Sequence, residues 1–128
     1  MQVRDGMSSL VLTVGPNHTL RDAARLMADR NVGAAVILDP DSAGPGIVTE
    51  RDILKSLAAG DDPNTELVGE HMTEPLISAS PDWSLEQAAD AMVQGGFRHL
   101  LVVDGGELRG ILSMRDIVRC WVGDHVAS

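Results

Sequence analysis

Two stretches of seven residues decide the fold: Gly46-Ile47-Val48-Thr49-Glu50-Arg51-Asp52 and Gly110-Ile111-Leu112-Ser113-Met114-Arg115-Asp116. Each places a glycine and two apolar residues before a hydroxyl residue, and each ends with arginine and aspartate. A short apolar run predicts a buried strand. A threonine or serine followed three residues later by an acid is typical of the first turn of a helix. Each stretch therefore predicts a strand that passes directly into a helix.

The two stretches belong to an internal repeat that extends along the chain. Identical residues recur at an offset of 65 positions, which falls to 64 in the later part because one loop of the second copy is shorter by one residue. Aligned identical pairs include Val3 and Val68, Met7 and Met72, Pro16 and Pro81, Leu20 and Leu85, Met27 and Met92, and Asp39 and Asp104. A unit of about 55 residues buries little surface alone, so we expect the two copies to share a core.

Each copy has the pattern β-α-β-β-α. In the first copy, residues 10–14 and 34–38 predict strands, and residues 20–30 carry apolar side chains at helical spacing. We expect a linking helix from residue 62 towards residue 72, with Pro63 in its first turn. The predicted fold class is α/β (α+β). Residues 1–61 form the first repeat with an N-terminal segment, and residues 62–128 form the linking helix and the second repeat.

Composition and charge exclude several classes of protein. Hydrophobic residues make up 44% of the chain, which argues against intrinsic disorder. A formal net charge of −9 with only 2% aromatic residues disfavours binding to nucleic acid or to an anionic membrane. No run approaches the ~20 apolar residues of a membrane helix, and residues 1–12 lack the features of a signal peptide. We therefore expect a cytoplasmic protein.

The repeat, the element order and the two junction motifs together resemble a tandem pair of CBS (cystathionine-β-synthase) domains, known as a Bateman module, of the stand-alone bacterial type. The stretch Phe97-Arg98-His99-Leu100-Leu101-Val102-Val103-Asp104 also resembles the helix-to-strand segment of that family. The resemblance implies a pseudo-two-fold pair of repeats and a non-catalytic regulatory module. It also implies that AMP, ADP, ATP or S-adenosylmethionine binds as a regulatory ligand in the cleft between the repeats, with no cofactor required.

The resemblance implies a set of binding residues around the junctions. It assigns the junction aspartates to the ribose hydroxyls and the junction hydroxyl residues to a phosphate. Independently of the family, a helix N-terminus favours an anion, and an arginine in the first turn can follow a phosphate. The candidate binding residues are Thr49, Arg51, Asp52, Arg98, His99, Ser113, Arg115 and Asp116.

The junction residues also have a simpler interpretation as helix caps, since Thr49 with Asp52 would cap a helix with no ligand present. A cap does not need the arginine that both copies retain. The first copy has Gly33 where the second has Arg98. We therefore expect one main adenosine-phosphate site, at the second junction, with Asp116 binding the ribose and Arg115 or Arg98 the phosphate. The alternative is a ligand-free pair that serves in dimerisation and partner docking.

We expect no metal site and no catalytic site. His18, His71 and His125 lack zinc-ligand spacing with one another or with the single cysteine, Cys120. The pair Asp61-Asp62 is interpreted as a helix entry rather than a calcium site. No nucleophile is indicated beside a base that could activate it, so the chain is not expected to be an enzyme.

The helices that follow the junctions carry more apolar surface than two small sheets can cover. Such faces usually mark an interface, and CBS pairs commonly pack helix faces into dimers, so we expect a homodimer and an unidentified regulated protein as partners. The apolar residues of these helices are Ile53, Leu54, Leu57, Ile117, Val118 and Trp121.

Overall fold

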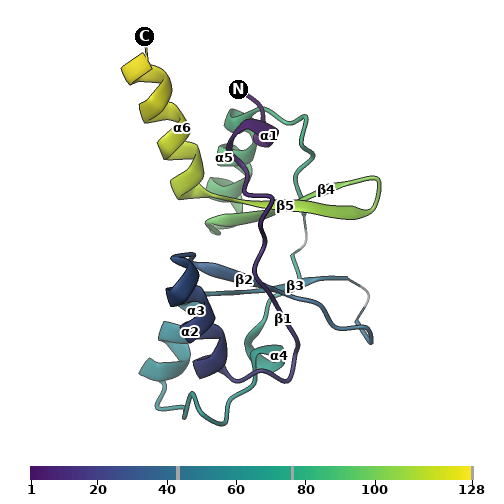
Figure 1. Cartoon of the computed structure of the whole chain (residues 1–128), viewed down its shortest axis with the longest axis vertical. Helices are drawn as coiled ribbons and strands as arrows, with labels where there is room; N and C mark the ends of the chain where they lie inside the picture. The colour runs from purple at the N-terminus through teal and green to yellow at the C-terminus, as the bar shows by residue number, and fades with distance from the viewer. Residues whose placement is uncertain (43, 76, 128) are drawn as a thin grey trace. The chain divides into compact units, whose positions relative to one another are not determined.

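The chain forms two compact units, Val11–Pro75 and Met1–Leu10 with Leu76–Ser128. The computed structural model describes residues 1–42, 44–75 and 77–127, with side chains as far as residue 123. Figure 1 shows the helices and strands along the chain. Each unit contains its own cluster of buried apolar side chains. The expectation that the two repeats also share a core stays a prediction.

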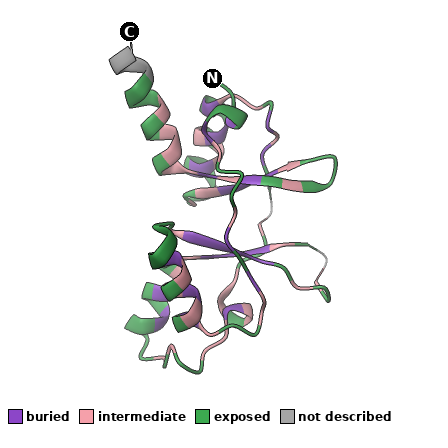
Figure 2. Ribbon diagram, viewed as in Figure 1, coloured by how far each residue is buried: buried purple, intermediate pink, exposed green. Residues whose placement is uncertain are grey.

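The unit Val11–Pro75 has the predicted β-α-β-β-α order followed by one more helical turn. Its sheet has the order β1-β2-β3, with β1 parallel and β3 antiparallel to β2. β2 is buried along its whole length, as Figure 2 shows. β1 is shorter than predicted because only two of its residues pair with β2. The elements are β1 (Thr13–Val14), α2 (Leu20–Arg30), β2 (Ala34–Ile37), β3 (Gly46–Thr49), α3 (Glu50–Ala58) and α4 (Val68–His71).

The second unit repeats this order with a reduced first strand. β4 and β5 form an antiparallel pair, and the place of the first strand is taken by one parallel bridge between Ala79 and Val102. The bridge is closed by hydrogen bonds from Ala79 N to Leu101 O and from Val103 N to Ala79 O, of 2.8 and 2.9 Å. The elements are α1 (Val3–Gly6), α5 (Leu85–Gly95), β4 (His99–Asp104), β5 (Glu107–Ser113) and α6 (Met114–Ala127).

Capping boxes fix the starts of α2 and α5. Thr19 and Ser84 are the N-cap residues, and each forms a reciprocal capping box with the residue three positions later, Asp22 and Gln87. The hydrogen bonds that Thr19 makes to the Asp22 carboxylate hold the pKa of that group below its ordinary value. Local sequence therefore sets where both helices begin.

A helical turn from outside each repeat completes each unit. Val3 in α1 belongs to the unit of the second repeat, where its N–H donates to Trp83 O at 2.7 Å. Val68 in α4 belongs to the unit of the first repeat, where its N–H donates to His18 O at 2.9 Å. Both valines are 0% exposed. Each repeat thus obtains its missing apolar contact from the segment that precedes the other repeat.

The predicted linking helix over residues 62–72 was wrong in its length. Asp62 O accepts hydrogen bonds from the N–H groups of Thr65 and Glu66, which form a turn. Leu67 then adopts extended backbone and forms an antiparallel bridge with Thr19. That bridge interrupts the helix, so only the single turn of α4 follows it. No helix in the described part of the chain is long and apolar enough to span a membrane.

The exchange of helical turns predicts opposite local effects for two matched substitutions. Val3→Ala and Val68→Ala each remove two buried carbon groups and leave a cavity, which should cost about 2 kcal/mol locally. Hydrogen exchange followed by mass spectrometry should show faster exchange in α5, β4 and β5 for Val3→Ala. Val68→Ala should instead accelerate exchange in β1, α2 and β2. Faster exchange of β1 and β2 in the Val3→Ala protein would contradict the assignment.

Candidate functional site

At the first junction, β3 passes directly into α3 through Thr49, which is the last residue of the strand and the N-cap of the helix. The Thr49 N–H donates to Asp52 Oδ2 at 2.8 Å, and the Asp52 N–H donates to Thr49 Oγ1 at 3.3 Å. The Thr49 hydroxyl is also 3.0 Å from Asp52 Oδ2. The capping interpretation is therefore confirmed here, and it fixes the aspartate at the start of the helix.

The second junction has the same reciprocal hydrogen bonds and one further ion pair. Ser113 N donates to Asp116 Oδ2 at 2.8 Å, and Asp116 N donates to Ser113 Oγ at 3.0 Å. Arg119 Nη2 donates to Asp116 Oδ1 at 2.8 Å. The Asp116 side chain is 15% exposed and the Arg119 side chain 65%. Asp116 is therefore held at one oxygen by the cap and at the other by a largely solvated arginine.

The backbone brings the predicted basic pair to the second junction. His99 pairs with Ser113 in the β4–β5 register, and Arg98 O accepts a 2.8 Å hydrogen bond from Met114 N at the start of α6. Arg98 is exposed and His99 is half-buried. The strand start and the helix start thus lie beside each other, as the site prediction requires.

The first residue of the helix differs between the junctions: it is Glu50 in α3 and Met114 in α6. Gly33 takes the position of Arg98, and its carbonyl accepts a 3.0 Å hydrogen bond from Glu50 N. A Cβ atom placed on Gly33 would lie 3.3 Å from the Glu50 carboxylate, so that acidic group lies over the glycine. Glu50 corresponds to Met114 in the second copy. The local field at the first junction is therefore less favourable to a phosphate.

Arg51 and Arg115 occupy the same position in α3 and α6. Both side chains are exposed, and neither forms an ion pair or side-chain hydrogen bond to another residue that the structure describes. The structure therefore leaves both guanidinium groups accessible to solvent ions or to a ligand. The part each would play in binding stays a prediction.

Other polar groups fall outside the junctions. A Cβ atom on Gly6 would lie 3.0 Å from Cys120 Sγ, so the thiol packs against the apolar cluster of its unit. His18 contacts Gly15 within its own turn, and the side chain of His125 lies outside the described residues. The hollow along residues 38–45 contains none of the candidate site residues.

One cluster goes beyond the sequence predictions, which mention His71 and Asp61 separately and do not mention Glu66. Side-chain ligand atoms of Asp61, Glu66 and His71 all lie within 4.8 Å of one another. The three residues are spaced five positions apart along the chain. The five-residue spacing is visible in the sequence, but it indicates a cluster of side chains only once the turn before α4 is known.

Comparison with known sequences identifies the repeat. A profile of the CBS domain matches residues 2–59 and 68–123. The CBS domain-containing protein YhcV of Bacillus subtilis (strain 168) is 40% identical over 116 residues, which cover 90% of this chain and 81% of that protein.

Solved structures with the same fold include ligand-bound and oligomeric proteins. The hexameric CBS-CP12 protein from bloom-forming cyanobacteria superposes with a TM-score of 0.85 at 32% identity, over 92% of this chain and 69% of that one. The CBS domain pair of protein MJ0100, in complex with 5′-methylthioadenosine and S-adenosyl-L-methionine, gives a TM-score of 0.84 at 29% identity. The match covers 97% of this chain and 98% of that one.

Removal of either junction cap should lower the stability of the protein even when no ligand is present. Thr49→Ala and Ser113→Ala each remove a hydroxyl that accepts a helix N–H, so each should lower the free energy of unfolding by about 0.5–2 kcal/mol. Arg51→Gln and Arg115→Gln are the controls and should stay within about 0.5 kcal/mol of the wild type. Urea denaturation followed by circular dichroism measures both. Arginine variants as destabilised as the cap variants would show that the guanidinium groups have a structural role.

Proposed function

The chain belongs to the CBS domain family and contains two copies of the domain, and from this premise we propose that it senses an adenosine-containing ligand at the second junction. The CBS pair is a regulatory module, and we propose that it has no catalytic activity of its own. The observation that carries the proposal is the convergence of Arg98, Ser113 and Asp116 at the start of α6. The MJ0100 relative, which holds 5′-methylthioadenosine and S-adenosyl-L-methionine, supports the class of ligand.

We assign the ribose to Asp116. Its Oδ2 stays in the cap, whereas its Oδ1 is paired with Arg119, whose side chain is 65% exposed. An ion pair with a solvated arginine contributes little to stability, so ribose hydroxyls can take its place at Oδ1 without a large loss. A carboxylate can accept hydrogen bonds from both hydroxyls of a ribose.

We assign the phosphate of a nucleotide to the arginines around the second junction. Arg98 adjoins the α6 N-terminus through its carbonyl, and Arg115 is exposed in the first turn of that helix. The helix dipole adds a partial positive charge at the same place. On a chain with a net charge of −9, the attraction for a phosphate must come from such local groups. Glu50 disfavours the same ligand at the first junction.

Binding of AMP, ATP and S-adenosylmethionine is best compared by titration calorimetry on matched aspartate variants. Asp116→Ala should weaken the preferred ligand roughly tenfold to a hundredfold, because a charged acceptor for two hydroxyls is lost. Asp52→Ala removes the equivalent cap at the other junction and should change the affinity by less than about threefold, within 0.7 kcal/mol.

Two calorimetry results would contradict a ligand site at the second junction. Loss of binding in Asp52→Ala alone would move the site to the first junction. Absence of binding by the wild-type protein to all three compounds would favour a second candidate function, a ligand-free pair that dimerises and docks a partner.

Exposed apolar side chains on the helices after the junctions support a homodimer. Leu54 on α3 is 66% exposed and Trp121 on α6 is 60% exposed, whereas Ile53 is buried in its own unit. Large exposed apolar groups of this kind usually mark an interface. The CBS-CP12 relative is hexameric, so assembly is compatible with the fold. We propose that these helix faces join two copies of the chain.

The assembly is measured by light scattering after size-exclusion chromatography. The wild type should give twice the 13.6 kDa of one chain at micromolar concentration. Trp121→Glu or Leu54→Glu should raise the dissociation constant at least about tenfold, because each places a charge in an apolar contact. Val93→Glu, at an exposed apolar position on α5, is the control and should remain dimeric. A wild-type mass of one chain would refute the dimer.

A further inference from the structure

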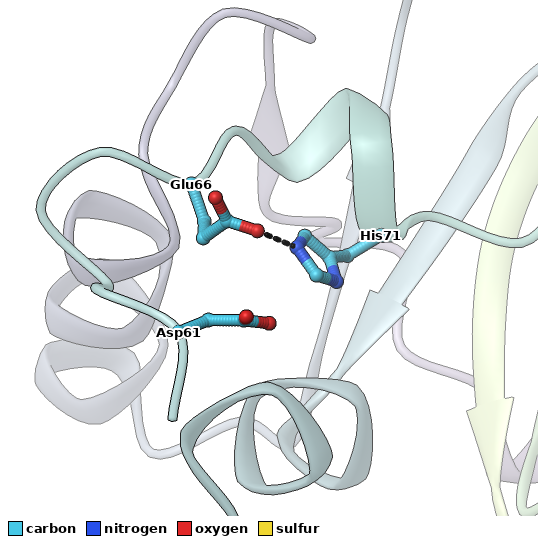
Figure 3. A group of neighbouring side chains, drawn as sticks. All are labelled: Asp61, Glu66 and His71. Carbon is cyan, nitrogen blue, oxygen red and sulfur yellow. Dashed lines mark hydrogen bonds and ion pairs between the residues drawn. The ribbon is translucent and has the colours of Figure 1, made fainter. Parts of the chain in front are cut away.

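We propose that Asp61, Glu66 and His71 form a binding site for one divalent transition-metal ion of the Zn²⁺ class. The three side chains come from the segment after α3, from the turn that follows it, and from the last residue of α4. Figure 3 shows the two carboxylates and the imidazole directed towards one another. Their ligand atoms all lie within 4.8 Å of one another. All three residues belong to one compact unit.

Asp61 is oriented by a buried hydroxyl. Ser56 is 5% exposed and is a buried polar residue on an otherwise apolar face of α3. Its Oγ donates to Asp61 Oδ2 at 2.8 Å, and its carbonyl accepts from Asp61 N at 3.1 Å. The two hydrogen bonds hold the Asp61 carboxylate in place beside the cluster. Such a hydrogen bond to a ligating carboxylate is the usual outer shell of a metal site.

Glu66 and His71 are held by the backbone that completes the unit. Glu66 N donates to Asp62 O at 3.0 Å, and Glu66 O accepts from Leu20 N at 2.9 Å. His71 ends the helical turn that begins at the fully buried Val68. His71 Nε2 lies 2.9 Å from Glu66 Oε1. Two of the three ligands are therefore already in contact on rigid backbone, and only small side-chain rotations would place an ion between them.

The donor set selects the class of metal. One imidazole with two carboxylates can bind Zn²⁺, which in catalytic sites takes three protein ligands and leaves a fourth position to water. Ca²⁺ and Mg²⁺ prefer oxygen ligands alone, so the imidazole disfavours them. Two carboxylates balance the charge of a divalent ion. The side chains of His71 and Glu66 are 22% and 30% exposed, which leaves the ion a path from solvent.

A bound ion would join the end of α3 to α4, the helical turn that completes this unit. Asp61 follows α3 by three residues, and His71 is the last residue of α4. Because an ion that binds only the folded state stabilises it, the metal would also reinforce the turn between the two elements. This stabilisation is independent of any ligand at the second junction.

The test uses the full chain without an affinity tag, freed of metal with a chelator and dialysed. Titration calorimetry with Zn²⁺ should show one ion per chain. Asp61→Asn and His71→Gln should each weaken the affinity on the order of 100-fold or more, since removing even an outer-shell partner costs 10–100-fold. Glu70→Gln, an exposed acid on the same helical turn, and His18→Gln, a histidine outside the cluster, should stay within about threefold, which is 0.7 kcal/mol.

Two further measurements test the same three ligands. Co²⁺ in place of Zn²⁺ should give visible absorption bands that disappear in His71→Gln but persist in His18→Gln. Ser56→Ala retains all three ligands and should lose about 10–100-fold in Zn²⁺ affinity. Circular dichroism of the metal-free variants confirms that they are folded. Failure of the wild type to bind Zn²⁺ at millimolar concentration, or binding that is unchanged in both Asp61→Asn and His71→Gln, would overturn the proposal.

Discussion

Each unit of this fold depends on one helical turn supplied by the segment that precedes the other repeat. Val3 fills the cluster of the second repeat and Val68 fills that of the first, and both are fully buried. A repeat of about 55 residues buries a small share of its surface and is marginally stable alone. The exchanged turns add buried apolar contacts to both units. Separating the chain at residue 61 would leave each half without its own completing turn.

At each junction one aspartate closes the helix cap, and we propose that Asp116 also binds the ligand. Asp52 and Asp116 both close a capping box, so their presence in both repeats has a structural cause. What differs between the junctions is the neighbouring charge. Glu50 lies over Gly33 in the first, whereas Arg98 adjoins the helix start in the second. That contrast, rather than the motif itself, leads us to propose the second junction as the nucleotide site.

The repeat, the order of elements and the helix starts could be predicted from the sequence because they depend on local patterns. The resemblance to a CBS pair, carried by the repeat, the element order and the two junction motifs together, is confirmed. The length of the linking helix could not be predicted, because the bridge between Leu67 and Thr19 ends it through a long-range contact. The cluster around His71 also depends on which segments meet in space. The position of the Glu50 carboxylate over Gly33 is likewise a contact that the sequence alone does not show.

An adenosine-ligand site at the second junction can be mapped residue by residue from amide chemical shifts during titration with AMP. We expect saturable shifts concentrated at residues 98–99 and 113–116, with residues 46–52 much less affected. Amides are suitable reporters because Ser113 N and Asp116 N take part in the cap that the ligand would adjoin. Shifts concentrated at residues 46–52, or no saturable shifts with AMP, ATP or S-adenosylmethionine, would contradict the account.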